Sequence, residues 1–172
     1  MGDFDFYEMG GKDAWPVKLK TVAITPGFRN VEKVGLIRDA DDDPEAAFQS
    51  VCDALRSSNL PVPQAPMVPA VGNVTVTVLI VPSRDENGCL EDLCLRSVAS
   101  DPIMPCIDDL FSCIGKNALQ MPDHVSKARL QTFIALKPGA CRLLGEAADA
   151  HYWPWSDESL DEVCQFLRAA LA

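Results

Sequence analysis

Two apolar segments with an amphipathic segment between them constrain the fold of this chain more than any other feature of its sequence. Val34 to Ile37 and Val74 to Val81 are short and apolar, as is typical of buried strands. Between them, Pro44 suits the first turn of a helix, and the apolar residues that follow it recur at helical spacing. These residues are Ala47, Phe48, Val51, Cys52 and Leu55. Strand, helix and strand in this order predict an α/β fold in which the two strands pair in parallel.

The segments around this unit extend the prediction toward the N-terminus and into the connection between the strands. Phe4, Phe6 and Tyr7 predict a short aromatic strand at the start of the chain. A helix is expected over Asp13 to Val22. The Pro-rich segment from Leu60 to Pro69 is predicted to be a surface connection rather than a linker between domains.

The C-terminal half is predicted to be mainly helical. One helix is expected to begin near Glu91, and three further groups of apolar residues recur at a spacing of three or four. These groups are Ile107, Leu110, Phe111 and Ile114; Leu130, Phe133 and Ile134; and Leu160, Val163, Cys164 and Leu167. A chain of 172 residues, 48% of them hydrophobic, can cover one core well. We therefore expect a single domain over residues 1–172.

Cysteine usage and hydropathy indicate the compartment. The seven cysteines form an odd set without a C-x-x-C pair, which argues against a disulfide framework and against a structural zinc site. Most of them have apolar neighbours, as small buried thiols of a reducing compartment do. No segment approaches the roughly 20 apolar residues that span a bilayer, and the acidic start from Met1 to Asp5 is unlike a signal peptide. We expect a cytoplasmic protein with no membrane partner.

Net charge limits the partners further. The formal net charge is -10, and nucleic-acid affinity depends mainly on clustered lysine and arginine. A broad phosphate-binding surface is therefore not expected. Any contact with a nucleic acid or a nucleotide would be local, or bridged by a metal ion.

An acidic loop follows the first predicted strand. Five of the seven residues from Asp39 to Glu45 are acidic, and like charges this close repel one another unless something neutralises them. Asp39 and Asp41 lie two residues apart at the end of an extended strand, so their carboxylates would point to one side and share one Mg²⁺ or Mn²⁺ ion. Asp42 and Asp43 are explained without an ion, as the cap and first-turn acids of the helix that follows.

A second acidic pair opens the helix after the second predicted strand. If the two strands are neighbours, Glu91 is a candidate catalytic acid and Asp92 a further metal ligand at the same sheet edge. Both acids are also explained as a match to the helix dipole. Later in the chain, His124, Lys127 and Gln131 share one helix face. Lys127 is a candidate contact for an anionic substrate, and a solvated helix face is the alternative interpretation.

Four segments carry a family resemblance. They are Gly10 to Asp13, Gly35 to Glu45, Gly88 to Leu93 and His124 to Ala128, of which the stretch I-R-D-A-D-D-D-P-E is the most specific. In this order they resemble an uncharacterised bacterial and archaeal family related to Toprim domains, the α/β metal-binding modules of topoisomerases, primases and overcoming-lysogenization-defect nucleases. The resemblance covers nearly the whole chain. It implies a three-layer domain with a mostly parallel central sheet and a helical C-terminal half.

The resemblance also bears on function. It implies that Asp39 and Asp41 match the D-x-D pair that holds Mg²⁺. In the wider group a further acid comes from a Glu-Gly motif in an earlier strand. Gly10 to Asp13 matches the second strand and its helix, so the usual first strand-helix unit has no counterpart here.

Two functions follow from this pattern. The first is a Toprim-like divalent-metal-binding protein that serves as a non-catalytic or regulatory module. The alternative is a Mg²⁺-dependent nuclease or phosphoryl-transfer enzyme acting on nucleic acid or nucleotides. A sheet without its first strand would expose an edge, and pairing of two copies across that edge would make a homo-oligomer.

Overall fold

The computed structural model describes residues 4–139 and 143–171. The chain forms two compact units, one of residues 1–89 with 162–172 and the other of residues 90–161. A compact unit of this kind need not fold alone. The division therefore neither confirms nor contradicts the predicted single domain over residues 1–172.

The first unit contains a parallel pair of strands. Strand β1 (Lys33–Asp39) and strand β2 (Thr75–Val81) run in register, with Lys33 opposite Thr75 and Asp39 opposite Val81. This pairing confirms the α/β class and the parallel arrangement expected from the two apolar segments. β1 extends beyond the predicted segment at both ends. The apolar pattern did not reveal these ends because they are polar and half-buried or exposed, and only Leu36 within the strand is buried.

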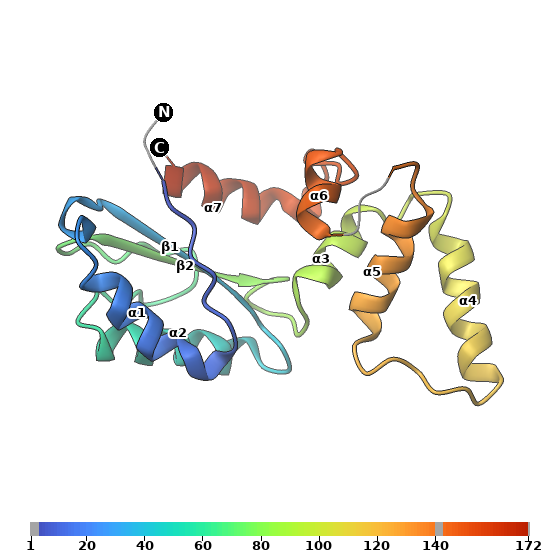
Figure 1. Cartoon of the computed structure of the whole chain (residues 1–172), viewed down its shortest axis with the longest axis horizontal. Helices are drawn as coiled ribbons and strands as arrows, with labels where there is room; N and C mark the ends of the chain where they lie inside the picture. The colour runs from blue at the N-terminus through green and yellow to red at the C-terminus, as the bar shows by residue number, and fades with distance from the viewer. Residues whose placement is uncertain (1–3, 140–142, 172) are drawn as a thin grey trace. The chain divides into compact units, whose positions relative to one another are not determined.

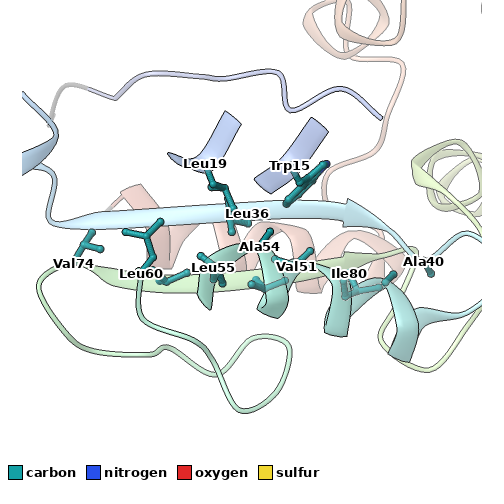
Figure 2. Packing of buried hydrophobic residues seen from close by; sticks show 13 residues of the cluster. Trp15, Leu19, Leu36, Ala40, Val51, Ala54, Leu55, Leu60, Val74 and Ile80 are labelled. Atoms are coloured by element: carbon teal, nitrogen blue, oxygen red, sulfur yellow. The ribbon is translucent and has the colours of Figure 1, made fainter. Parts of the chain in front are cut away.

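Two helices cover one face of these strands. Helix α1 (Trp15–Ala23) follows a short 3-10 turn, η1 (Lys12–Ala14), and a second 3-10 turn, η2 (Phe28–Asn30), precedes β1. Helix α2 (Pro44–Ser57) joins the strands, as predicted. Figure 2 shows the apolar side chains of both helices meeting the strands. The most deeply buried are Leu19, Ala40, Val51, Ala54, Leu55, Val76, Val78 and Ile80.

Helix α7 (Asp161–Leu171) contacts the opposite face of the strands (Figure 1). The contact is made at Gly35, where an added Cβ would lie 2.8 Å from Cζ of Phe166. Phe166 is buried but lies outside the predicted apolar group of this helix. Gly35 is therefore required by a close approach that spacing within the helix does not reveal.

All regular secondary structure in the described residues of the second unit is helical. It comprises α3 (Leu90–Ser97), α4 (Met104–Lys116), α5 (Val125–Leu136), α6 (Leu144–Asp149) and the 3-10 turn η3 (Glu158–Leu160). Its core centres on the fully buried Phe133, whose ring stacks on Trp153 at a centroid distance of 5.7 Å. This unit accounts for most of the helical C-terminal half that the sequence predicts.

Three expectations from the sequence are corrected. Phe4, Phe6 and Tyr7 form no strand and are 49%, 83% and 54% exposed, because an alternating pattern forms a strand only where another strand pairs with it. Leu110, which the spacing places with the core residues of its helix, is exposed. Two thiols, Cys106 and Cys113, are also exposed rather than buried.

A helix that spans a membrane must be both long and apolar. Across residues 4–139 and 143–171, no helix combines the length and the apolar character needed to cross a bilayer.

Candidate metal centre

The acidic loop lies at the carboxyl edge of the two strands. β1 and β2 are parallel and end level with one another, at Asp39 and Val81. The ladder continues for one more bond, because the Ala40 N–H donates to the Val81 carbonyl oxygen at 2.7 Å. This edge is where open α/β sheets bind their ligands.

Two backbone hydrogen bonds join the loop after β1 to the loop after β2. The Asp41 N–H donates to the Gly88 carbonyl oxygen at 2.9 Å, and the Gly88 N–H donates to the Asp41 carbonyl oxygen at 2.8 Å. Asp41 has a φ of 52°, in the left-handed region that aspartate tolerates better than most residues. The backbone position of Asp41 is thus fixed from both sides, while its side chain is 66% exposed.

This turn changes one assumption made from the sequence. The expectation that Asp39 and Asp41 point to one side required extended backbone through both residues. β1 ends at Asp39, and the left-handed φ of Asp41 removes the alternation of an extended strand. Asp39 itself is half-buried. The relative direction of the two carboxylates is therefore set by the turn and its bonds to Gly88.

Arg38 lies beside the acidic loop and is nearly buried. Its side chain is 9% exposed, and its guanidinium carbon lies 5.5 Å from the centre of the Trp15 ring. Its Nη2 is 3.9 Å from Oδ2 of Asp41, too long for a hydrogen bond. Within the described residues, the buried Nε has no hydrogen-bond partner. The guanidinium is held mainly by packing, and Asp41 is only weakly neutralised.

Asp43 has the structural role that the sequence predicts. Its Oδ1 accepts a hydrogen bond from the Ala46 N–H at 2.9 Å, which caps α2, and Pro44 occupies the start of the helix. Asp42 is exposed. The acids of the loop therefore divide into a helix cap and a set at the turn.

The loop after β2 carries acids that the sequence-based ligand set omits. The Arg84 Nε donates to Oδ2 of Asp85 at 3.3 Å, and the Asp85 N–H donates to Oγ of Ser83 at 3.2 Å. Glu86 is exposed in the same loop. Their position after a parallel strand was the available signal, since such loops meet at one sheet edge.

The remaining predicted site residues belong to the second unit. The Ser126 hydroxyl donates to a carboxylate oxygen of Asp92, so the opening of α3 is tied to that of α5. Glu91 is half-buried on α3, and Lys127 is exposed on α5. Asp92 therefore holds a hydrogen bond inside its own unit, alongside the metal-ligand role expected from the sequence.

The thiol of Cys94 is buried in the second unit. Burial, followed by the nearby charge of Glu91, raises the pKa of this thiol to about 12. Cys94 is consequently protonated at neutral pH, where a thiol is a weak nucleophile.

No group of three or more histidine, cysteine, aspartate or glutamate side chains in the described residues is placed to hold a metal ion. A cation at the acidic loop would therefore be held by two protein carboxylates, with water as its other ligands.

Comparison with known proteins gave one match. The model of a family described as "Protein of unknown function (DUF3226)" matches residues 2–172. Searches of curated proteins and of solved structures gave no match.

Proposed function

We propose that this chain, which belongs to the DUF3226 family of proteins of unknown function, binds a divalent metal ion. In this proposal it is a Toprim-like protein that acts as a binding or regulatory module. Asp39 and Asp41 hold Mg²⁺ or Mn²⁺ in this proposal. The membership itself supplies no activity, so the proposal depends on the chemistry of the acidic loop.

The observation that carries the proposal is the fixed and exposed position of Asp41. Its backbone is bonded to Gly88 on both sides, yet its carboxylate is 66% exposed and its nearest cation is 3.9 Å away. Asp41 also stands among like charges, since Asp39, Asp42 and Asp43 are its close neighbours in sequence. A divalent cation at this position would relieve the repulsion among these carboxylates.

Two carboxylates are sufficient for the proposed ion. Mg²⁺ loses its water reluctantly and is commonly bound through one or two carboxylates, with water or phosphate oxygens completing an octahedron. The absence of a three-residue cluster within the described residues is thus compatible with Mg²⁺. It is less compatible with a structural zinc ion, which takes four protein ligands.

Two features support the Toprim-like part of the proposal. Helices contact both faces of a parallel strand pair, and an acidic D-x-D pair follows the first strand. The Glu-Gly motif that supplies a further acid in Toprim domains has no counterpart among the matched segments. Glu8, which precedes Gly10, is exposed in a segment that is not a strand. A binding or regulatory role therefore fits better than catalysis.

Calorimetric titration with Mg²⁺ and with Mn²⁺ tests the proposal. Asp41→Asn keeps a side chain that tolerates left-handed φ while it removes the charge, and Asp39→Asn does the same on β1. Each change is expected to weaken metal affinity about tenfold or more, because a unit charge close to a divalent ion is lost. Asp13→Asn, an exposed acid outside the loop, is the matched control and should bind as the wild type does. Equal affinity in all four proteins would refute the site.

A second candidate function is a Mg²⁺-dependent nuclease or phosphoryl-transfer enzyme, and Arg38 is the observation that favours it. The Arg38 guanidinium lies 3.9 Å from the carboxylate of Asp41. In this alternative it would contact an oxygen of a phosphate group that is bound to the same metal ion. In this alternative, Glu91 is an auxiliary acid, Asp92 a further ligand and Lys127 an anion contact. Nicking of plasmid DNA or hydrolysis of phosphate esters that requires Mg²⁺ and disappears in Asp41→Asn would select it.

A further inference from the structure

The two edges of the β1–β2 pair are unequal. The Thr75 N–H donates to the Glu32 carbonyl oxygen at 2.8 Å, and the Ala40 N–H donates to the Val81 carbonyl oxygen at 2.7 Å. Backbone groups alternate in direction along a strand, so the even-numbered residues of β1 bond to β2. The N–H and C=O groups of Lys33, Gly35 and Ile37 therefore point away from β2.

The outer edge of β2 is partly closed. The amide and carbonyl of Ala70 both bond to Val76, at 2.8 and 2.9 Å, and the Met67 N–H donates to the Val78 carbonyl oxygen at 2.8 Å. These residues belong to the irregular connection that precedes β2. The connection covers the edge where another strand would otherwise add.

The outer edge of β1 is open. Within residues 4–139 and 143–171, the outward backbone groups of Lys33, Gly35 and Ile37 make no backbone hydrogen bond, and all three residues are exposed. A row of unpaired backbone groups is a template for another strand, and a two-stranded sheet gains stability from further strands. The Ile37 side chain is 44% exposed beside this edge.

We propose that β1 pairs in antiparallel fashion with β1 of a second copy of this chain, with a two-fold axis at Leu36. Such an axis keeps equivalent faces of the two strands on the same side of the sheet. Because side chains alternate between the faces, a residue with an odd number must lie opposite another odd-numbered residue, and an even one opposite an even one. One register satisfies this condition and also pairs all of β1, and it sets Lys33 opposite Asp39 and Gly35 opposite Ile37. The result is one continuous four-stranded sheet. The pairing does not rest on the proposed metal function, but Asp39 takes part in both, so the pairing is tested without metal.

The side chains of this register complement one another. Lys33 and Asp39 carry opposite charges and meet twice, once at each end of the paired strands. The Lys33 ammonium donates to the Ala169 carbonyl oxygen at 3.0 Å, which leaves two further donors for a carboxylate. Ile37 lies opposite Gly35, a position that is covered by the ring of Phe166. The strand is thus suited to a copy of itself.

Charge reversal tests the partner and the register together. Sedimentation velocity of the full chain in EDTA, over a range of concentrations, should show a reversible dimer. Lys33→Glu and Asp39→Lys should each weaken dimerisation roughly tenfold, because two attractive pairs become repulsive. The double variant should restore it. Lys20→Glu, an exposed reversal on α1, is the matched control and should dimerise normally.

Hydrogen exchange tests the edge itself. The amides of Leu36 and Arg38 bond within the ladder and should be protected at any concentration. The amides of Gly35 and Ile37 should become protected only at concentrations where the dimer forms. A monomer at all concentrations would overturn the proposal. So would a dimer that leaves the Gly35 and Ile37 amides unprotected, or one that the double variant fails to restore. Loss of metal binding would not affect either measurement, so the two proposals can fail separately.

Discussion

The acidic loop of the first unit differs from the paired acids of the second unit. In the second unit, Asp101 pairs with Lys137 and Asp108 with Arg129. In the acidic loop of the first unit, the cation nearest to Asp41 is Arg38, 3.9 Å away and held against an aromatic ring. Asp101 and Asp108 therefore have close basic partners, whereas Asp41 at the turn of the loop has only a distant one.

This contrast separates structural charge from charge available to a ligand. A paired carboxylate must lose its partner before it can bind an ion, and a weakly paired one need not. The loop keeps like charges together at the sheet edge, which costs stability in the absence of a cation. The acidic loop is therefore a better candidate for binding a cation than the paired acids of the second unit.

The largest expected effect comes from the core of the second unit. Phe133→Ala removes a fully buried ring that stacks on Trp153 and lies 4.7 Å from Nζ of Lys137. We expect the free energy of unfolding in urea to fall by about 3–5 kcal/mol. Metal affinity at a temperature where the variant is folded should equal that of the wild type. A lost metal site in the folded variant would contradict a site built from the first unit alone.

Asp101→Asn probes a paired acid. The side-chain hydrogen bond from Lys137 and the backbone hydrogen bond from Ile103 lower the pKa of Asp101 below its ordinary value of 3.8. A lowered pKa adds stability that is complete above the unfolded value and is lost as pH falls through the folded one. The variant should therefore be less stable than the wild type by about 1.5 kcal/mol at pH 7. Thermal unfolding from pH 7 to pH 3 should show this gap narrowing below the unfolded value, and a constant gap would contradict the pairing.

Local features of the sequence predicted much of the first unit. The apolar segments around Leu36 and Val78 identified the two strands because strands covered by helices are apolar along much of their length. Asp43 and Pro44 identified the start of α2 because a cap depends on residues three or four apart. In both cases the information needed is contained within a few neighbouring residues.

Other features depended on partners distant in the chain. The left-handed turn at Asp41 is fixed by Gly88, and Phe166 is buried because Gly35 admits it. Neither pair is visible in periodicity. The aromatic pattern from Phe4 failed for the same reason, since its local alternation was sound but no strand pairs with it. The candidate site was therefore predictable in composition but not in geometry.

Asp43→Ala distinguishes the structural acid of the loop from its neighbours. The variant loses the 2.9 Å hydrogen bond that caps α2, and we expect a loss of about 1 kcal/mol in the free energy of unfolding. Asp42→Ala is the matched control, because Asp42 is exposed and makes no cap, and it should unfold as the wild type does. Equal losses in both variants would mean that the loop acids act together rather than in separate roles.

The smallest effect is expected at Asp41, and it bears most directly on the comparison between the units. In EDTA, Asp41→Asn should change the free energy of unfolding by less than about 0.5 kcal/mol, because a long ion pair to an exposed carboxylate contributes little and the lost charge also relieves repulsion. In saturating Mg²⁺ the wild type should gain stability in proportion to the logarithm of metal concentration, and the variant should gain much less. A loss well above 1 kcal/mol in EDTA would show that Arg38 and Asp41 form a structural pair. The acidic loop would then resemble the paired acids of the second unit, and its charge would be explained without a cation.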